Sequence, residues 1–222
     1  MSSTATGYGL KPLNLIGGQA FNGGVMREIK VSANNSAAIF FGDLVVLSSA
    51  GQPSAVASTS PVAIKIPATS ADATAGIIGV MVGARYVNPS TKQPVWTNYL
   101  PANTITGGAT DVWIMVMDDP DALFQVKGSA ALGTFNSGTA GSGWPGAIGK
   151  NAALGFGSGG NTANGVSSFN LVVGSNGGSL AATSTLALRI VDTVRGTESD
   201  DYPEFIVKLN VGVHSYNNSL GV

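Results

Sequence analysis

The chain has 222 residues and a mass of 22.3 kDa, and its 44% apolar content is enough for a substantial hydrophobic core. Only 11 basic and 12 acidic residues are present, 10% of the chain against roughly 25% in an ordinary soluble domain, so we expect neighbouring subunits to cover much of the surface. The basic residues are scattered singly, which argues against direct nucleic-acid binding, and the absence of cysteine excludes disulfides, thiolate metal sites and cysteine nucleophiles.

Residues 1–24 are the first predicted unit, an extended N-terminal arm. The arm holds six glycines, and its apolar side chains are Leu10, Leu13, Leu15 and Ile16. We do not expect such a segment to pack independently, and it is suited to lie along the sheet edge of a neighbour and add a strand there. Residues 1–14 show no basic segment followed by an apolar run, so no secretory signal is expected.

The rest of the chain predicts an all-β fold. Short apolar runs rich in Val, Ile and Phe are bounded by Gly, Pro, Asn and Ser, and no helical period is visible. The longest apolar runs, such as 112–117, are too short to cross a bilayer, so no membrane partner is expected. The expected strands are 25–33, 37–47, 54–58, 77–86, 111–117, 123–126, 168–173, 184–194 and 204–213.

Two patterns of burial are expected among these strands. Residues 185–191 and 205–211 alternate between apolar and polar side chains, as half-buried strands do. Residues 77–82 are apolar on both faces, which requires protein from this chain or another on each side. We therefore expect a subunit interface there, formed by Ile77, Ile78, Val80 and Val82.

Composition changes near residue 128 and suggests four units. Between 128 and 188 the only charged residue is Lys150, and 15 of the 31 glycines lie there. We interpret 128–183 as a Gly-rich insertion of loops and short strands, a second lobe or an extended arm. The strands of 25–127 and of 184–222 then form one β-barrel-like sheet core.

Motifs for catalysis or cofactor binding are missing. His214 is the only histidine, and no G-x-S-x-G elbow is present, so we expect His214 at the surface or at an interface. Gly149-Lys150 fails as a phosphate loop because Trp144 and Asn151 occupy positions that need Gly and Ser or Thr. The glycines of 155–160 are interpreted as turn residues. We expect no catalytic residue, no cofactor and no metal, and hence no enzyme.

Two acidic clusters leave an alternative open. Their members are Asp118, Asp119 and Asp121 in the first, and Glu198, Asp200, Asp201 and Glu204 in the second. Closely spaced carboxylates can chelate calcium, but Asp-Pro-Asp after a strand is ordinary β-turn chemistry. We favour turns and solvated surface over calcium, and the spacing does not favour a glycosidase carboxylate pair.

Four aromatic residues, Trp96, Tyr99, Trp113 and Trp144, allow two interpretations. They can line a sugar-binding face. Alternatively, Trp113 lies in the core because its strand is densely apolar, and Trp144 lies at a contact between subunits, where aromatic residues are enriched. We favour the second interpretation.

Six short segments spread over most of the chain carry a further signal. They are Gly9-Leu10-Lys11-Pro12-Leu13, Phe21-Asn22-Gly23-Gly24, Ala38-Ile39-Phe40-Phe41-Gly42-Asp43-Leu44-Val45, Ile77-Ile78-Gly79-Val80-Met81-Val82-Gly83, Asp118-Asp119-Pro120-Asp121-Ala122-Leu123-Phe124-Gln125-Val126, and Leu186-Ala187-Leu188-Arg189-Ile190-Val191. In this order they resemble the head decoration, or cement, proteins of tailed bacteriophages. Residues 128–183 match least. The pairing of a G-D-L-V strand with a later I-G-V strand is similar to the β-tulip of the lambda head-stabilising protein.

The resemblance implies a non-catalytic homotrimer on the outer surface of the phage head. Its partner is the major capsid protein, which it reinforces against internal DNA pressure after assembly in the host cytoplasm. In this role Leu10, Leu13, Leu15 and Ile16 are the expected capsid contacts, and Trp144 joins the expected subunit interface.

Three other classes stay open. The first is a different virion component, such as a minor head protein or a tail or fibre protein. The second is a carbohydrate-binding β-module, and the third is a carboxylate-pair hydrolase.

Overall fold

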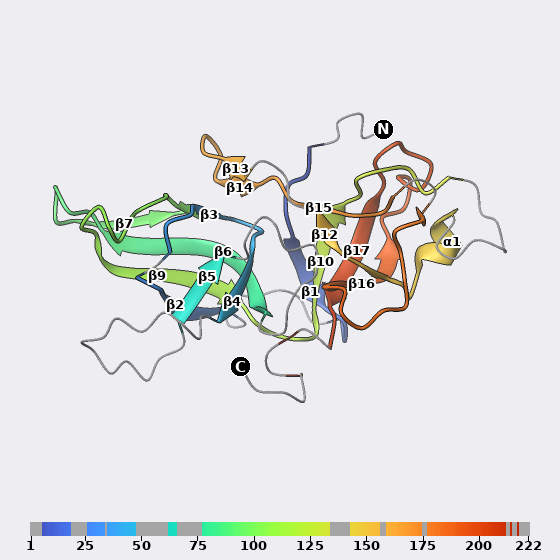
Figure 1. The fold of residues 1–222 in the computed structure, drawn as a ribbon, viewed down its shortest axis with the longest axis horizontal. Helices are drawn as coiled ribbons and strands as arrows, with labels where there is room; N and C mark the ends of the chain where they lie inside the picture. Colours follow the sequence, from blue (N-terminus) through green and yellow to red (C-terminus); the bar gives the residue numbers. More distant parts are fainter. Residues whose placement is uncertain are drawn as a thin grey trace.

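The computed structural model describes residues 6–18, 26–33, 35–47, 62–65, 77–133, 143–155, 159–174, 177–211, 214 and 217, with 62–65 described by their backbone alone. The fold is all-β, as predicted from the composition of the apolar runs. Two sheets lie side by side along the long axis of the molecule (Figure 1). The strand expected at 54–58 lies outside the described residues.

The first half is a curled sheet of six strands in the order β4-β5-β2-β9-β6-β7. Its strands are β2 (Met26–Val31), β4 (Leu44–Leu47), β5 (Val62–Lys65), β6 (Ile77–Val87), β7 (Pro94–Thr97) and β9 (Thr110–Met117). Strand β4 pairs with β6 as well as β5, so five of the strands form a closed ring of pairings. The barrel-like part of the prediction is therefore confirmed. A short pair, β3 (Ile39–Phe40) and β8 (Tyr99–Leu100), lies beside it.

The first part of strand β6 is buried on both faces by its own chain. Ile78 packs inside the barrel with Val45 and Val116, whereas Ile77 and Val80 pack in the core of the other half. All three of these β6 residues are 0% exposed, and Val82 is partly buried against the same core as Ile77. The prediction of a subunit interface at Ile77, Ile78 and Val80 is therefore wrong, because these side chains have no surface to offer a neighbour.

The second half is an antiparallel sheet of five strands in the order β1-β10-β17-β16-β11. Its strands are β1 (Lys11–Leu15), β10 (Ala122–Lys127), β11 (Asn151–Ala152), β16 (Leu188–Thr193) and β17 (Glu204–Leu209). Along β17, Phe205, Val207 and Leu209 are buried and the residues between them are half-buried. The alternation expected for 205–211 is confirmed over this strand.

The boundary between the two sheets lies at the turn 118–121 and not near residue 128. Strand β9 ends at Met117 in the barrel, and the chain then crosses to β10, which pairs with β17. Strands β16 and β17 thus complete the second sheet and make no pairing with the strands of 26–117. The prediction that the strands of 25–127 and of 184–222 form one sheet system is wrong. The turn at 118–121 directs β10 into the second sheet, one strand before the change in composition near residue 128.

The Gly-rich region covers one face of the second sheet. It contains α1 (Gly143–Ala147), β12 (Leu154–Gly155), β13 (Gly160–Asn161), β14 (Val166–Ser167) and β15 (Asn170–Leu171). Leu132, Phe169 and Leu171 are buried in one cluster with Phe124 and Phe205 of the sheet. Most of the region is therefore part of the second half's core and not a separate lobe, because its scattered apolar side chains supply one side of that core. The β13–β14 pair lies against the barrel, where Val166 bridges to Phe41.

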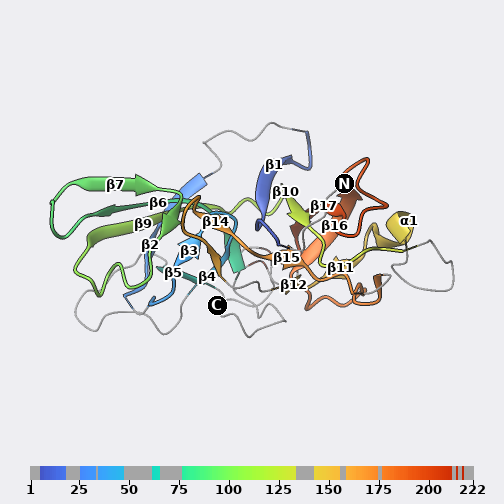
Figure 2. The same cartoon turned by 90° about the horizontal axis from the view of Figure 1, so that it is seen from above.

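The N-terminal arm is an integral part of the fold. Strand β1 pairs with β10 and lies between the two halves in both views (Figures 1 and 2). The Gly9 and Leu10 amides donate to the carbonyls of Phe169 and Gly42, each at 3.0 Å. Leu10 is 0% exposed, which contradicts its predicted role as a capsid contact, because it is an anchor in its own core. Leu13 and Leu15 are half-buried, and Ile16 is 50% exposed.

Candidate binding surface

Four side chains stand in one row across the solvent-facing side of the barrel. Lys30 of β2 is opposite Trp113 of β9, Trp113 is opposite Arg85 of β6, and Arg85 is opposite Trp96 of β7. Residues paired directly across neighbouring strands project on the same face of a sheet. Cations and aromatic rings therefore alternate along the row. We call this row, with the adjacent Glu28 and Asp111, the Arg85 platform.

The Arg85 guanidinium lies at the centre of the platform. It donates to both carboxylate oxygens of Glu28, at 3.1 Å from Nε and 3.0 Å from Nη2, and its Nη1 donates to Asp111 Oδ2 at 2.6 Å. Its Cζ lies 5.9 Å from the ring centroid of Trp96 and 5.5 Å from that of Trp113, within cation–π range. The hydrogen bonds to Glu28, and then those to Asp111, raise the pKa of Arg85 further above its usual range.

Asp111 contacts both Trp113 and Arg85 of the platform. The indole Nε1 of Trp113 donates to its Oδ1 at 2.5 Å, while Arg85 holds its Oδ2. The Trp113 hydrogen bond, followed by the Arg85 hydrogen bond, lowers the pKa of the Asp111 carboxyl. Its backbone has a φ of 53°, in the left-handed region that Asp tolerates better than most residues. The neighbouring contacts hold this conformation in place.

The platform combines exposure with fixed geometry. Trp96 is 64% exposed, and the side chains of Glu28 and Asp111 are 42% and 51% exposed. Its formal charges cancel, because Lys30 and Arg85 balance the two carboxylates. Both carboxylates are engaged by one guanidinium. The arrangement is therefore suited to binding a ligand at the surface.

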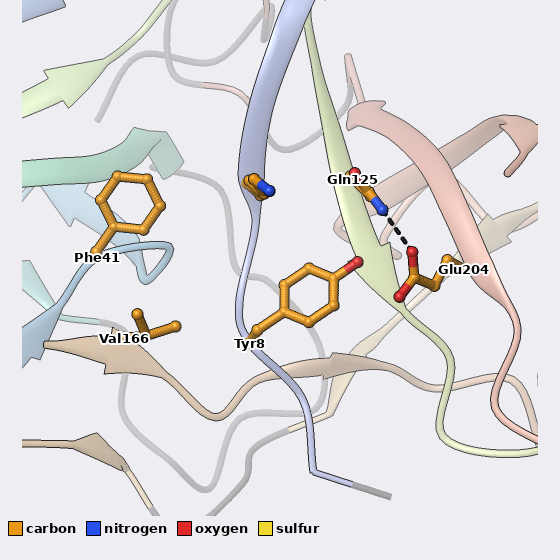
Figure 3. Close-up of a pocket in the computed structure, with 6 residues that line it drawn as sticks. Tyr8, Phe41, Gln125, Val166 and Glu204 are labelled. Atoms are coloured by element: carbon orange, nitrogen blue, oxygen red, sulfur yellow. Dashed lines mark hydrogen bonds between the residues drawn. The ribbon is translucent and has the colours of Figure 1, made fainter. Parts of the chain in front are cut away.

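A pocket of about 360 Å³ lies at the seam where the arm meets both halves. Figure 3 shows the Tyr8 ring in this pocket with its hydroxyl directed toward Gln125 and Glu204. Gln125 Nε2 donates to Glu204 Oε2 at 2.5 Å. Burial, and then the negative charge of Glu204, raises the pKa of the Tyr8 phenol well above its usual range, so Tyr8 stays a neutral phenol. Phe41 and Val166 form the opposite wall (Figure 3).

A second groove, of about 610 Å³, lies at the far end of the second half. Trp144 and Pro145 of α1 form one side, and Glu198, Ser199 and Asp200 form the other. Trp144 is 49% exposed, so it is accessible to a partner. Its expected role at a subunit contact stays a prediction.

Two of the residues discussed from the sequence, His214 and Trp113, occupy other environments than expected. His214 is 0% exposed and bridges to Ile77, so the prediction of a surface or interface position is wrong, because the C-terminal segment returns to the core there. Burial lowers the pKa of His214, against the opposing effect of Asp118. Trp113 is on the outer face of its strand and not in the core. Tyr99 stacks on Phe40, with ring centroids 5.3 Å apart.

The first acidic cluster is a turn, as favoured from the sequence. Asp119 Oδ1 accepts from the Asp121 amide at 2.8 Å, and Asp121 pairs with Lys208 at 3.1 Å. Asp118, directly after β9, pairs with Arg27 of the neighbouring strand β2 at 2.6 Å. In the second cluster, Glu198 accepts from the Gly196 amide at 2.7 Å. Within the described ranges, no group of three or more His, Asp or Glu residues is arranged to hold a metal ion.

Sequence reasoning grouped the two tryptophans of the platform only in the interpretation that it did not favour, and it missed the polar members, Glu28, Lys30, Arg85 and Asp111. One signal was available locally. Asp111 and Trp113 are two residues apart in a strand, so they share a face. The remaining members depend on the pairing register of β2, β6 and β9, which alternation within one strand does not specify.

Neither a protein-family model, nor a curated protein, nor a solved structure matches the chain. Among the described residues, no helix is both long enough and apolar enough to cross a membrane.

Proposed function

We propose that this chain is a virion structural protein that decorates the outside of a tailed-phage head as a homotrimer and stabilises the shell. Its partners in this proposal are the major capsid protein and two further copies of itself. The motifs that resemble cement proteins motivate the proposal, and the surface described below supports it.

The observation that carries the proposal is that the chain has few charges, and that seven of the 23 charged residues pair with one another within the described part of the chain. Arg27 pairs with Asp118, Arg85 with Glu28 and Asp111, and Lys208 with Asp121. The rest of the surface is mostly neutral and polar, and the net charge of the chain is −1. Such a surface gives weak electrostatic protection against association, and it suits a subunit that is permanently part of an assembly.

The exposed apolar side chains indicate which half of the molecule forms the contacts. Apart from Trp96, the large apolar residues exposed among those described all lie in the second half of the molecule. They are Ile16, Trp144, Ile148 and Val211, with exposures of 50%, 49%, 38% and 51%. We assign contacts with sister subunits and with the capsid to this half. The barrel half, which carries the Arg85 platform, then projects away from the shell.

The continuous core suits a load-bearing role. The cluster around Phe124 and Phe205 also contains Leu44, Ile77 and Met117 of the barrel, and the arm adds Leu10 from between the halves. A close-packed interior has low compressibility and transmits strain, so force on one half reaches the other without a hinge. A brace on a pressurised shell needs this property.

The proposal is tested with heads of the encoding phage that lack this chain. We expect the wild-type protein to co-sediment with these heads to saturation and to raise the temperature at which they release DNA. Replacing Ile16, Trp144 and Ile148 by Asp together should abolish binding, whereas Trp96→Ala, at the other end, should leave it unchanged. Wild-type protein that does not bind, or antibody labelling confined to the tail, would overturn the decoration role.

A further inference from the structure

We propose that the Arg85 platform is a binding site for a neutral carbohydrate chain. This inference goes beyond a role in the shell and does not depend on it, because the platform lies on the barrel half. Its basis is the combination of an exposed indole, a buttressing guanidinium and two fixed carboxylates on one face of the sheet.

The indole of Trp96 supplies the stacking surface. With 64% of the residue exposed, its ring presents an apolar face to solvent at the edge strand β7. Sugar rings carry one face of C–H groups, which packs on an aromatic ring with little demand on charge. Trp113 lies two strands away, at about 10 Å given ordinary strand spacing. That separation suits two linked sugar units, one near each indole.

The carboxylates supply the hydrogen-bond acceptors. Glu28 and Asp111 are both held by Arg85, yet their side chains are 42% and 51% exposed, so each keeps lone pairs that face solvent. Carboxylates accept hydrogen bonds from the hydroxyl groups of a sugar. The exposed Lys30 ammonium donates hydrogen bonds to the oxygens of such hydroxyl groups. A chain of hydroxyl groups meets both requirements.

The charge balance selects a neutral ligand. The charges of the two cations and two anions of the platform cancel, and Arg85 is already paired with both carboxylates. A phosphate or sulfate chain would therefore be repelled by Glu28 and Asp111. A second copy of this chain is also a poor fit. Charged residues are depleted at the centre of protein interfaces, whereas four of the six residues here are charged.

The platform is pre-organised for binding. The guanidinium makes three hydrogen bonds and lies within 6 Å of both rings, and the Trp113 indole is fixed by Asp111. Side chains held in this way lose little conformational freedom when a ligand arrives. Weak stacking contacts then yield measurable affinity.

The test is titration of the intact chain with a panel of neutral hexasaccharides of glucose, mannose, xylose and galactose, followed by tryptophan fluorescence and calorimetry. We expect at least one to bind with a dissociation constant in the millimolar range or tighter. Trp96→Ala should weaken that binding by about tenfold or more, and Glu28→Gln by roughly threefold to tenfold. Trp144→Ala is the matched control, because Trp144 is also exposed but lies in the other half.

Three outcomes would overturn the inference. One is that no neutral hexasaccharide binds, and a second is that Trp144→Ala weakens binding as much as Trp96→Ala does. The third is that heparin or Trp96-dependent self-association occupies the platform in place of neutral sugar. Trp96→Phe separates stacking from folding, since it keeps an aromatic ring on an exposed site and should retain part of the affinity. Head binding by the wild type is measured in parallel, so failure here is distinguishable from failure of the decoration role.

Discussion

Gly9 and Gly42 meet backbone to backbone where the arm crosses the barrel. A Cβ on Gly9 would lie 2.7 Å from Ser167 Cβ and 2.8 Å from the Gly42 carbonyl oxygen, and a Cβ on Gly42 would lie 2.9 Å from the Leu10 amide nitrogen. Their φ angles are 75° and 89°, in the left-handed region. Both requirements point to glycine, so at this point single residues decide how the arm is attached.

Gly42→Ala should therefore lower the free energy of unfolding by about 2–4 kcal/mol, from left-handed strain and overlap combined. Gly149→Ala is the control, because Gly149 has a φ of 81° but no atom within 4 Å of an added Cβ. Its cost should be about 1–2 kcal/mol. Urea denaturation measures both, and equal losses would contradict the close contact between arm and barrel.

His214 is the residue that couples stability to pH. Burial lowers its pKa in the folded chain below the ordinary value of 6.5, while Asp118 and Asp119 oppose the shift and Lys208 adds to it. The unfolded chain therefore binds the proton first as pH falls, so stability is complete above pH 6.5 and declines below it. We expect urea midpoints to fall between pH 7 and pH 5 more steeply for the wild type than for His214→Gln. Parallel curves would contradict the buried neutral imidazole.

At the scale of elements, strand β1 decides whether the arm belongs to this chain or to a neighbour. It pairs with β10, and the residue before it, Leu10, is fully buried. Attachment to its own core makes β1 an integral strand of the fold, and Ile16, directly after β1, faces outward.

Leu10→Ala should cost about 2–5 kcal/mol of stability because it empties a fully buried site. Ile16→Ala, at a residue 50% exposed, should change stability by less than about 0.5 kcal/mol. Thermal and urea unfolding compare the two variants directly. A tolerated Leu10→Ala would mean that the arm is docked elsewhere in solution.

Elements with a strong local pattern could be predicted, and the others could not. Strands β6, β9 and β17 show long apolar runs or alternation, and their expected bounds agree with the structure to within a few residues. Strand β1 was missed because Pro12 and Asn14 break its alternation and its partner is over 100 residues away. The Gly-rich pairs β12–β15 and β13–β14 have two residues a strand, too few for any period. The candidate site was not predicted as a unit: its tryptophans were grouped only in the interpretation that was not favoured, and its polar members depend on register across strands.

At the scale of the whole molecule, the two halves share one hydrophobic cluster. Leu44 and Met117 of the barrel pack with Phe124 and Phe205 of the second sheet. The barrel has a second cluster of its own around Ile78 and Val116, and the shared cluster joins its outer side to the core of the second half.

Unfolding should accordingly be one cooperative transition. Trp96 and Trp113 report on the barrel and Trp144 on the other half, so single-tryptophan variants can follow each part separately. Their fluorescence transitions in urea should coincide with each other and with circular dichroism. Two separated transitions would contradict a shared core.

Assembly through the second half is measured by sedimentation velocity of the purified chain. We predict one species at three times 22.3 kDa at micromolar concentration, reduced to monomer by Trp144→Asp with Ile148→Asp and unaffected by Trp96→Ala. A wild-type monomer of 22.3 kDa under the same conditions would contradict it.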